Sequence, residues 1–174
     1  MYLTGRGVQQ DYSAAALWLR RAAEQGYALA QSNLGTLYRD GRGVTQDHTE
    51  AVMWFRKAAD QGDAVAEFLL GSQYANGGGV PKDFSEAMIW FGRAAAQAHP
   101  VAMLHLGVMY AEGRGVPQDY VRAHMWFSLA AAQGEQRAAK TLTEMAERRM
   151  TPAQITEAQK LARDWKPATQ PPLR

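Results

Sequence analysis

A short pattern recurs four times in this chain at an unvarying spacing of 36 residues. Each copy opens with Gly-x-Gly-Val, has an aspartate six residues after the first glycine, and has a tryptophan thirteen residues after it. The copies begin at Gly5, Gly41, Gly77 and Gly113, and their tryptophans are Trp18, Trp54, Trp90 and Trp126. Self-similarity at a fixed period of this size is typical of a solenoid of stacked helical units.

Each unit is predicted to be a pair of helices. In the unit at residues 28–62, apolar residues recur at helical spacing first through Ala30, Leu34, Leu37 and Tyr38, and then through Ala51, Trp54, Phe55, Ala58 and Ala59. No segment alternates as a strand would. We therefore expect an all-α superhelix of antiparallel helix pairs, with helices at about 12–25, 28–39, 48–61, 64–75, 84–97, 100–111, 120–133, 135–149 and 152–165.

Residues with helix-capping or close-packing roles support these bounds. An aspartate just before each second helix is in the N-cap position, namely Asp11, Asp47, Asp83 and Asp119. A glycine inside the first helix predicts that a neighbouring helix packs closely over it, at Gly35, Gly71 and Gly107. Ala98 stands where other units close with Gly26, Gly62 and Gly134, so the turn there is expected to differ locally.

Composition excludes several classes of function. The 19 basic residues barely exceed the 17 acidic ones and form no cluster, which argues against nucleic-acid binding. The chain has no cysteine, so disulfides, thiol catalysis and cysteine-bound metals are excluded. No apolar run reaches the ~20 residues of a membrane helix. As written, the chain has no signal peptide and would be cytoplasmic, whereas an upstream signal would send it to the periplasm or out of the cell.

Chemistry-bearing residues form no recognisable catalytic or metal-binding constellation. The four histidines have no metal-site spacing, and His48 takes a position that is aromatic in other units, so it is expected to pack. No serine lies in a nucleophile-elbow pattern. The tryptophans could form a sugar or quaternary-ammonium cage, but their period favours the core. We predict no catalytic residues, no cofactor and no metal.

The repeated residues resemble the Sel1-like repeat family, which is related to tetratricopeptide repeats. The resemblance rests on residues that recur in each full unit, in the first of them Ala30, Leu34, Gly35, Tyr38, Gly41, Gly43, Val44, Asp47, Ala51, Trp54, Ala58, Ala59 and Gly62. It covers most of residues 1–146 and implies a right-handed superhelix with a concave inner face. Residues from about 135 depart from the pattern and are expected to cap the solenoid, which would span 1–166, with a disordered proline-rich tail at 167–174.

The resemblance implies a bacterial adaptor that binds a protein or peptide and has no enzymatic activity. The alternative is an envelope enzyme or β-lactam-binding protein, as proposed for cysteine-rich relatives, although this chain lacks their cysteines. In tetratricopeptide-like solenoids the first helices line the concave side. Transferred to this sequence, that face is apolar in the middle units, and the predicted partner-binding residues are Val65, Phe68, Leu69, Val101, Leu104, His105 and Val108. A simpler interpretation is that Val65, Phe68 and Leu104 close the seam between neighbouring first helices.

The N-terminal unit is expected to be incomplete. Met1 and Tyr2 align with Leu37 and Tyr38, so the chain lacks most of that unit's first helix and is expected to be a fragment or to start at a late methionine. The helix at about 12–25 would then expose Leu17 and Trp18. An uncovered apolar edge of this kind favours self-association.

Overall fold

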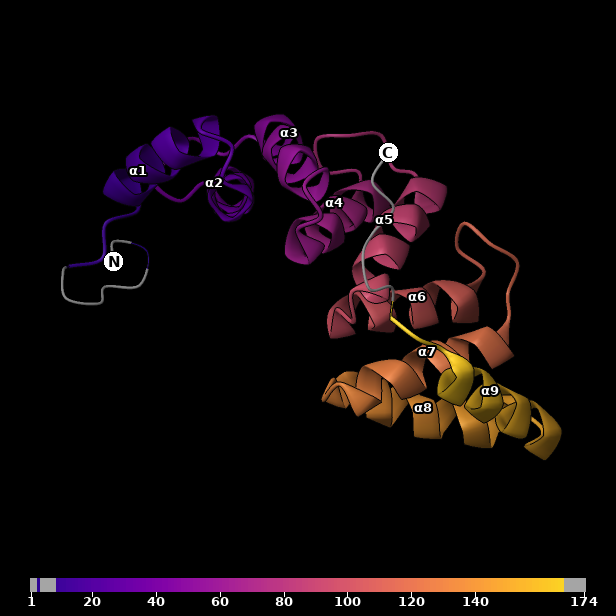
Figure 1. Ribbon diagram of the computed structural model, residues 1–174. Coiled ribbons are helices and arrows are strands. Elements are labelled where there is room, and N and C mark those ends of the chain that lie inside the picture. The colour runs from indigo at the N-terminus through magenta and orange to yellow at the C-terminus, as the bar shows by residue number, and fades with distance from the viewer. Residues whose placement is uncertain (1–2, 4–8, 168–174) are drawn as a thin grey trace. The chain divides into compact units, whose positions relative to one another are not determined.

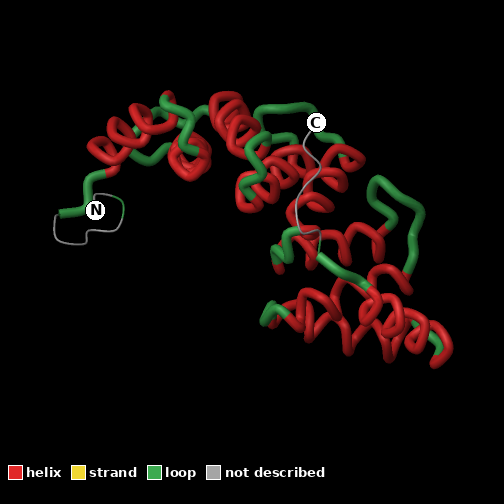
Figure 2. The backbone as a smooth tube through the Cα atoms, viewed as in Figure 1, coloured by secondary structure: helices red, strands yellow, loops and turns green. Residues whose placement is uncertain are grey.

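The computed structural model describes residue 3 and residues 9–167, and all regular structure among them is helical (Figures 1 and 2). The all-α architecture expected from the repeat is confirmed. Every described helix begins and ends within two residues of its predicted bounds. The helices are α1 (Tyr12–Glu24), α2 (Ala28–Asp40), α3 (His48–Ala59), α4 (Ala64–Asn76), α5 (Phe84–Ala96), α6 (Pro100–Glu112), α7 (Tyr120–Ala132), α8 (Gln136–Arg149) and α9 (Pro152–Asp164).

Contacts divide the chain into two units, Met1–Lys82 and Asp83–Arg174. In the first unit α1 packs on α2, α2 on α3, and α3 on α4. In the second unit α5 packs on α6, α6 on α7, and α7 on both α8 and α9. Helices therefore pack mainly on their neighbours in the chain, as in other repeat proteins. The predicted tail falls largely on residues 168–174, which lie outside the described residues.

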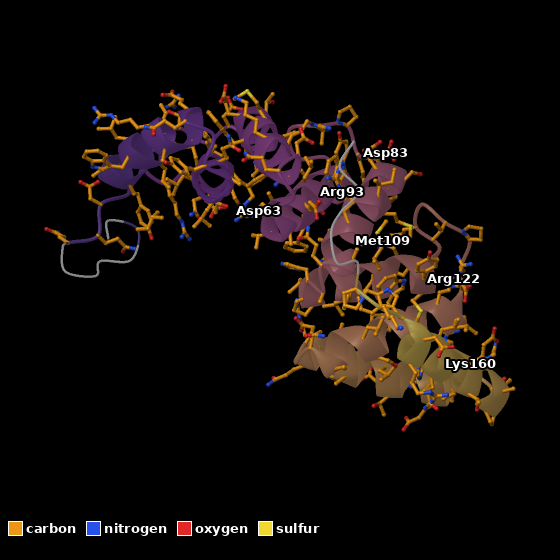
Figure 3. All side chains as sticks on the ribbon, viewed as in Figure 1. Asp63, Asp83, Arg93, Met109, Arg122 and Lys160 are labelled. Carbon is orange, nitrogen blue, oxygen red and sulfur yellow. The ribbon has the colours of Figure 1, made fainter. Side chains whose placement is uncertain are left out.

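The four aspartates predicted as N-caps all act as such. Asp11, Asp47 and Asp83 each accept hydrogen bonds from two first-turn amides at 2.8–3.1 Å. Asp119 accepts one, from the Arg122 amide, at 2.9 Å. Figure 3 labels Asp83 and Arg122, at the starts of α5 and α7. Because each carboxylate is used to satisfy otherwise unpaired helix amides, these residues are structural.

Two of the glycines inside the first helices, Gly35 and Gly107, pack directly against a phenylalanine of the paired second helix. A Cβ added at Gly35 would lie 2.7 Å from the Phe55 ring, and one at Gly107 would lie 2.6 Å from the Phe127 ring. Both phenylalanines are almost fully buried. The close approach predicted from these glycines is thus confirmed, and it explains why a poor helix former recurs there.

The Gly-x-Gly-Val turn packs on the second helix of the preceding repeat. A Cβ at Gly43 would lie 2.2 Å from the Tyr12 carbonyl oxygen, and one at Gly79 would lie 2.2 Å from that of His48. The residue between the two glycines extends this contact, because Arg42 lies over the Tyr12 ring with its Cζ 5.6 Å from the centroid.

Two expectations for individual residues are wrong. His48 was expected to pack but is exposed, and the reason is that the residue matching Arg42 one repeat later is Gly78, which has no side chain to cover the ring. The turn at Ala98 was expected to differ, but Ala98 adopts φ +61°, the same left-handed region as Gly62 at φ +83°. The repeat geometry imposes this conformation on an alanine, and His99 and Pro100 then begin α6 as its N-cap and first residue.

The core also contains polar groups that sequence reasoning did not identify. Gln31 is buried, and its Nε2 donates to the Ala23 carbonyl at 3.1 Å while its Oε1 accepts from Gln61 at 2.7 Å. One repeat later the same position is Glu67, which is fully buried. Buried polar side chains need hydrogen-bond partners, and Gln31 has two within the core.

Candidate interaction surface

Exposed apolar side chains lie at the start of both first helices of the first unit, α2 and α4. Leu29 on α2 is 70% exposed and Val65, at the same repeat position on α4, is 50% exposed. We call these two residues the first-helix pair. Both follow the short turn that ends the preceding second helix, where the chain enters α2 and α4. A side chain of this kind gains free energy when a partner removes it from water, by roughly 25 cal/mol per Å² of apolar surface.

The other predicted partner-binding residues differ in exposure. Phe68 on α4 and Val101, His105 and Val108 on α6 are half-buried. Leu69 and Leu104 are only 9% and 7% exposed and belong to the core. Leu104 therefore fits the simpler interpretation, in which it closes a seam between helices, whereas Val65 does not. A partner could reach Val65 most readily.

His105 is held in an apolar setting within the second unit. Its ring stacks on Phe91 with centroids 5.0 Å apart and the planes 21° from parallel. Burial lowers the pKa of His105, and the positive charge of Arg137 lowers it further, while Glu135 opposes this shift. The imidazole is therefore held in its neutral form, which suits packing and apolar contact better than ion pairing.

The last helix pair replaces the apolar residues with charged ones. Arg137, Lys140, Glu144 and Glu147 on α8 are all exposed. The Arg137 Nε donates to Glu135 Oε1 at 3.0 Å, and this hydrogen bond lowers the pKa of Glu135 and raises that of Arg137. An ion pair whose arginine is exposed adds little stability, but it makes the end of the second unit polar.

The exposure of two further apolar side chains on second helices, Met53 and Ile89, was missed, whereas that of Leu17 was expected. Leu17 on α1, Met53 on α3 and Ile89 on α5 occupy the same repeat position and are 53%, 38% and 56% exposed. The sequence carried a signal, since an apolar residue recurs immediately before each tryptophan, including Met125. It was overlooked because, among the second helices, an exposed apolar edge was expected only at about 12–25.

His124, one of the potential catalytic groups, is used in a structural contact. His124 is 4% exposed, burial lowers its pKa, and its Nδ1 lies 3.3 Å from Ser128 Oγ one helical turn away. Within the described ranges no three His, Cys, Asp or Glu side chains gather as a metal site, and no helix is long and apolar enough to span a membrane. A hollow of about 460 Å³ is polar and open, and is lined by Arg20, Tyr38, Val44, Thr45, Gln46, Asp47 and Glu50. Arg20 donates to the Tyr38 hydroxyl there.

Comparisons with known proteins agree on the repeat. The family model for the Sel1 repeat matches residues 1–27, 28–63, 64–99 and 100–135. The same boundaries separate the helix pairs, because α2, α4 and α6 begin at residues 28, 64 and 100. A search of curated proteins found no match.

Solved structures share the fold. A Sel1 repeat protein from Oxalobacter formigenes is 37% identical with a TM-score of 0.82, over 94% of this chain and 68% of that one. The protective antigen c5321 of uropathogenic Escherichia coli, which has an SLR fold, is 32% identical with a TM-score of 0.54, over 94% of this chain and 44% of that one. Cysteine-rich protein B of Helicobacter pylori is 23% identical with a TM-score of 0.60, over 79% of this chain and 99% of that one, and shows the fold alone.

Proposed function

The chain belongs to the Sel1 repeat family, and from this premise we propose that it is a non-catalytic scaffold that binds a protein or peptide through the exposed side of its first helices. Scaffolds that mediate protein interactions are common in this family. The observation that carries the proposal is the exposure of the first-helix pair, Leu29 at 70% and Val65 at 50%. An exposed apolar surface with polar surroundings is typical of interaction sites.

Within the first unit, Asn33, Thr36 and Phe68 extend this surface. Asn33 and Thr36 are half-buried on α2, and the Thr36 hydroxyl donates to the Ser32 carbonyl at 3.1 Å. Phe68 lies one helical turn after Val65 on α4 and is half-buried. Apolar anchors beside small polar groups suit an extended peptide or the apolar face of a helix.

In the second unit, the same proposal concerns Val101, His105 and Val108 on α6. All three are half-buried, and the neutral His105 ring adds a flat surface next to the two valines. This surface is less exposed than the first-helix pair. We therefore expect the first unit to contribute more of the binding free energy.

The test is a pull-down with quantitative mass spectrometry, using the double variant Leu29→Glu with Val65→Glu. Both side chains are exposed, so the variant should keep the helical circular dichroism and Tm of the wild type but lose the partners that the wild type captures. Met53→Glu is the matched control, because Met53 is an exposed apolar residue of the same unit on a second helix. Identical sets of captured proteins for all three chains would reject the proposal.

Leu104 is unsuitable for this test because it is buried, and Leu104→Glu would measure folding instead. A separate assay addresses the non-catalytic half of the proposal. A panel of hydrolase substrates that includes nitrocefin should show no turnover above buffer. Turnover that a point substitution abolishes would favour the envelope-enzyme alternative.

A further inference from the structure

Two carboxylates in the first unit stand where helix electrostatics disfavour them. Glu24 is the last residue of α1, Asp60 directly follows α3, and the two occupy the same repeat position. The C-terminal end of a helix carries partial negative charge, so a basic side chain is favourable there and an acidic one is not. In the second unit the same position is Ala96 and Ala132. The repeat itself therefore does not require a carboxylate at this position.

Neither carboxylate is satisfied within the part of the chain that the structure describes. Both residues are exposed, and no ion pair or hydrogen bond joins either carboxylate to another described residue. The cations one turn earlier are engaged elsewhere, because Arg21 lies over the Trp18 ring and Lys57 over the Trp54 ring. Residues that break a local rule without a compensating contact are expected at functional sites.

An exposed apolar side chain accompanies each carboxylate. Leu29 comes five residues after Glu24, and Val65 comes five residues after Asp60. Five residues of chain span at most about 18 Å, so one short peptide can reach a carboxylate and its apolar neighbour together. Val65 is 50% exposed although α1, α2 and α3 all precede it, so its exposure is a property of an interior repeat. We call Glu24, Leu29, Asp60 and Val65 the acidic edge.

Tyr27 adds an aromatic ring to the acidic edge. It is 63% exposed and is the N-cap residue of α2, but its side chain makes no capping hydrogen bond. The matching residue of α4, Asp63, does cap its helix, since it accepts from the Ala66 amide at 2.7 Å (labelled in Figure 3). The tyrosine thus replaces a helix cap with an exposed aromatic face, which attracts the cation of a lysine or arginine.

We propose that the acidic edge binds a peptide that carries lysine or arginine next to an apolar residue. The cations of the peptide pair with Glu24 and Asp60, and its apolar side chains cover Leu29 and Val65. The negative charge repels the phosphates of nucleic acids and of lipid headgroups, so a basic protein segment is the partner that this edge fits. The inference rests on the proposed binding through the first helices and adds the charge of the partner.

The first experiment selects binders for the whole chain from a displayed library of random peptides about twelve residues long. Peptides selected by the wild type should carry more Lys and Arg than Asp and Glu. The variant Leu29→Gln with Val65→Gln should select none of them. Selected peptides without excess positive charge, but lost in this variant, would reject the basic partner and keep the proposed function. No selection by the wild type would reject both.

The second experiment measures the affinity of the most enriched peptide by fluorescence anisotropy. Glu24→Gln with Asp60→Asn should weaken binding about tenfold in low salt and remove most of its salt dependence, because the attraction to both carboxylates is lost. Glu144→Gln with Glu147→Gln is the matched control. It changes the net charge by the same amount at exposed residues of α8, and should leave the affinity unchanged.

Stability distinguishes a binding role of the two carboxylates from a structural one. The Tm of the variant Glu24→Gln with Asp60→Asn should equal or exceed that of the wild type, because an unfavourable charge is removed from two helix ends. A Tm lower by several degrees would show that the carboxylates support the fold, and would overturn the proposal. Equal weakening of peptide binding by this variant and by the α8 control would show a general effect of net charge and would also overturn it.

Discussion

The first repeat and the interior repeats place the same residue in different surroundings. Trp18 is 56% exposed, while Trp54 and Trp90 are 5% exposed. A cation nevertheless lies over each ring from one turn further along its helix, with Arg21 at 5.0 Å, Lys57 at 4.2 Å and Arg93 at 4.6 Å from the centroids. The contact inside the helix follows from local spacing and is therefore the same in all three repeats. Burial depends on which helix packs against the face, and this differs between the first repeat and the others.

The largest expected effect tests this comparison directly. Trp54→Ala and Trp90→Ala should each lower the free energy of unfolding by ~3–5 kcal/mol, because each removes a large buried ring and leaves a cavity. Trp18→Ala should lower it by less than about 1 kcal/mol, since most of that ring is already in water. Urea unfolding followed by circular dichroism measures all three. A loss for Trp18→Ala as large as for Trp54→Ala would mean that the first repeat is covered in solution.

The same contrast separates what could be predicted from the sequence from what could not. The helices, the aspartate caps and the close packing over Gly35 and Gly107 were predicted correctly, because each depends on residues within one or two turns or on a strict repeat. The exposure of His48 and the burial of Glu67 were not predicted. The exposure of His48 depends on which side chain the adjacent repeat supplies, and a 36-residue pattern averages over such differences.

The prediction of the candidate interaction surface from the sequence was limited in the same way. Helical spacing and the resemblance to tetratricopeptide-like solenoids placed Val65, Leu69 and Leu104 on one predicted binding face. Of these three residues, only Val65 is exposed. The angle between neighbouring helices decides which residues near the edge of a face are covered, and it is set by packing that periodicity does not contain. The exposure of Met53 and Ile89 was missed for a related reason, since an apolar residue next to a core position need not belong to the core.

Two glycines in the second unit should respond in opposite directions to the same substitution. Gly107→Ala should destabilise the chain by about 1–3 kcal/mol, because the new Cβ would meet the buried Phe127 ring. Gly92→Ala should stabilise it by about 1 kcal/mol, because Gly92 lies inside α5, a Cβ there meets no atom within 4 Å, and alanine favours the helix. The pair of variants measured by urea unfolding distinguishes a glycine required by packing from one that is not. A gain in stability for Gly107→Ala would contradict the close approach.

A smaller effect is expected at Ala98, where the other repeats have a glycine. Ala98→Gly should stabilise the chain by about 1 kcal/mol, because the left-handed conformation strains any residue with a Cβ. Gly134→Ala is the matched reverse change, since Gly134 has φ +88° and a Cβ there also meets no atom within 4 Å. It should destabilise by a similar amount. If Ala98→Gly were neutral while Gly134→Ala was destabilising, the turn at Ala98 would have relaxed to another conformation in solution.

The smallest effect distinguishes the two units by their response to acid. His105 and His124 both lie in the second unit, and burial lowers the pKa of each from its ordinary 6.5. Below pH 6.5 the unfolded chain binds protons at these residues while the folded chain does not, so the free energy of unfolding falls from that point until the folded pKa is reached. Hydrogen exchange, corrected for intrinsic rates, should therefore show α6 and α7 losing protection between about pH 7 and pH 5.5, and α2 and α3 losing less. The control replaces each histidine by the residue two repeats earlier, with His105→Asn as in Asn33 and His124→Val as in Val52. This double variant should lose the extra sensitivity of the second unit. If the difference between units persists in it, groups other than these histidines cause the loss of protection.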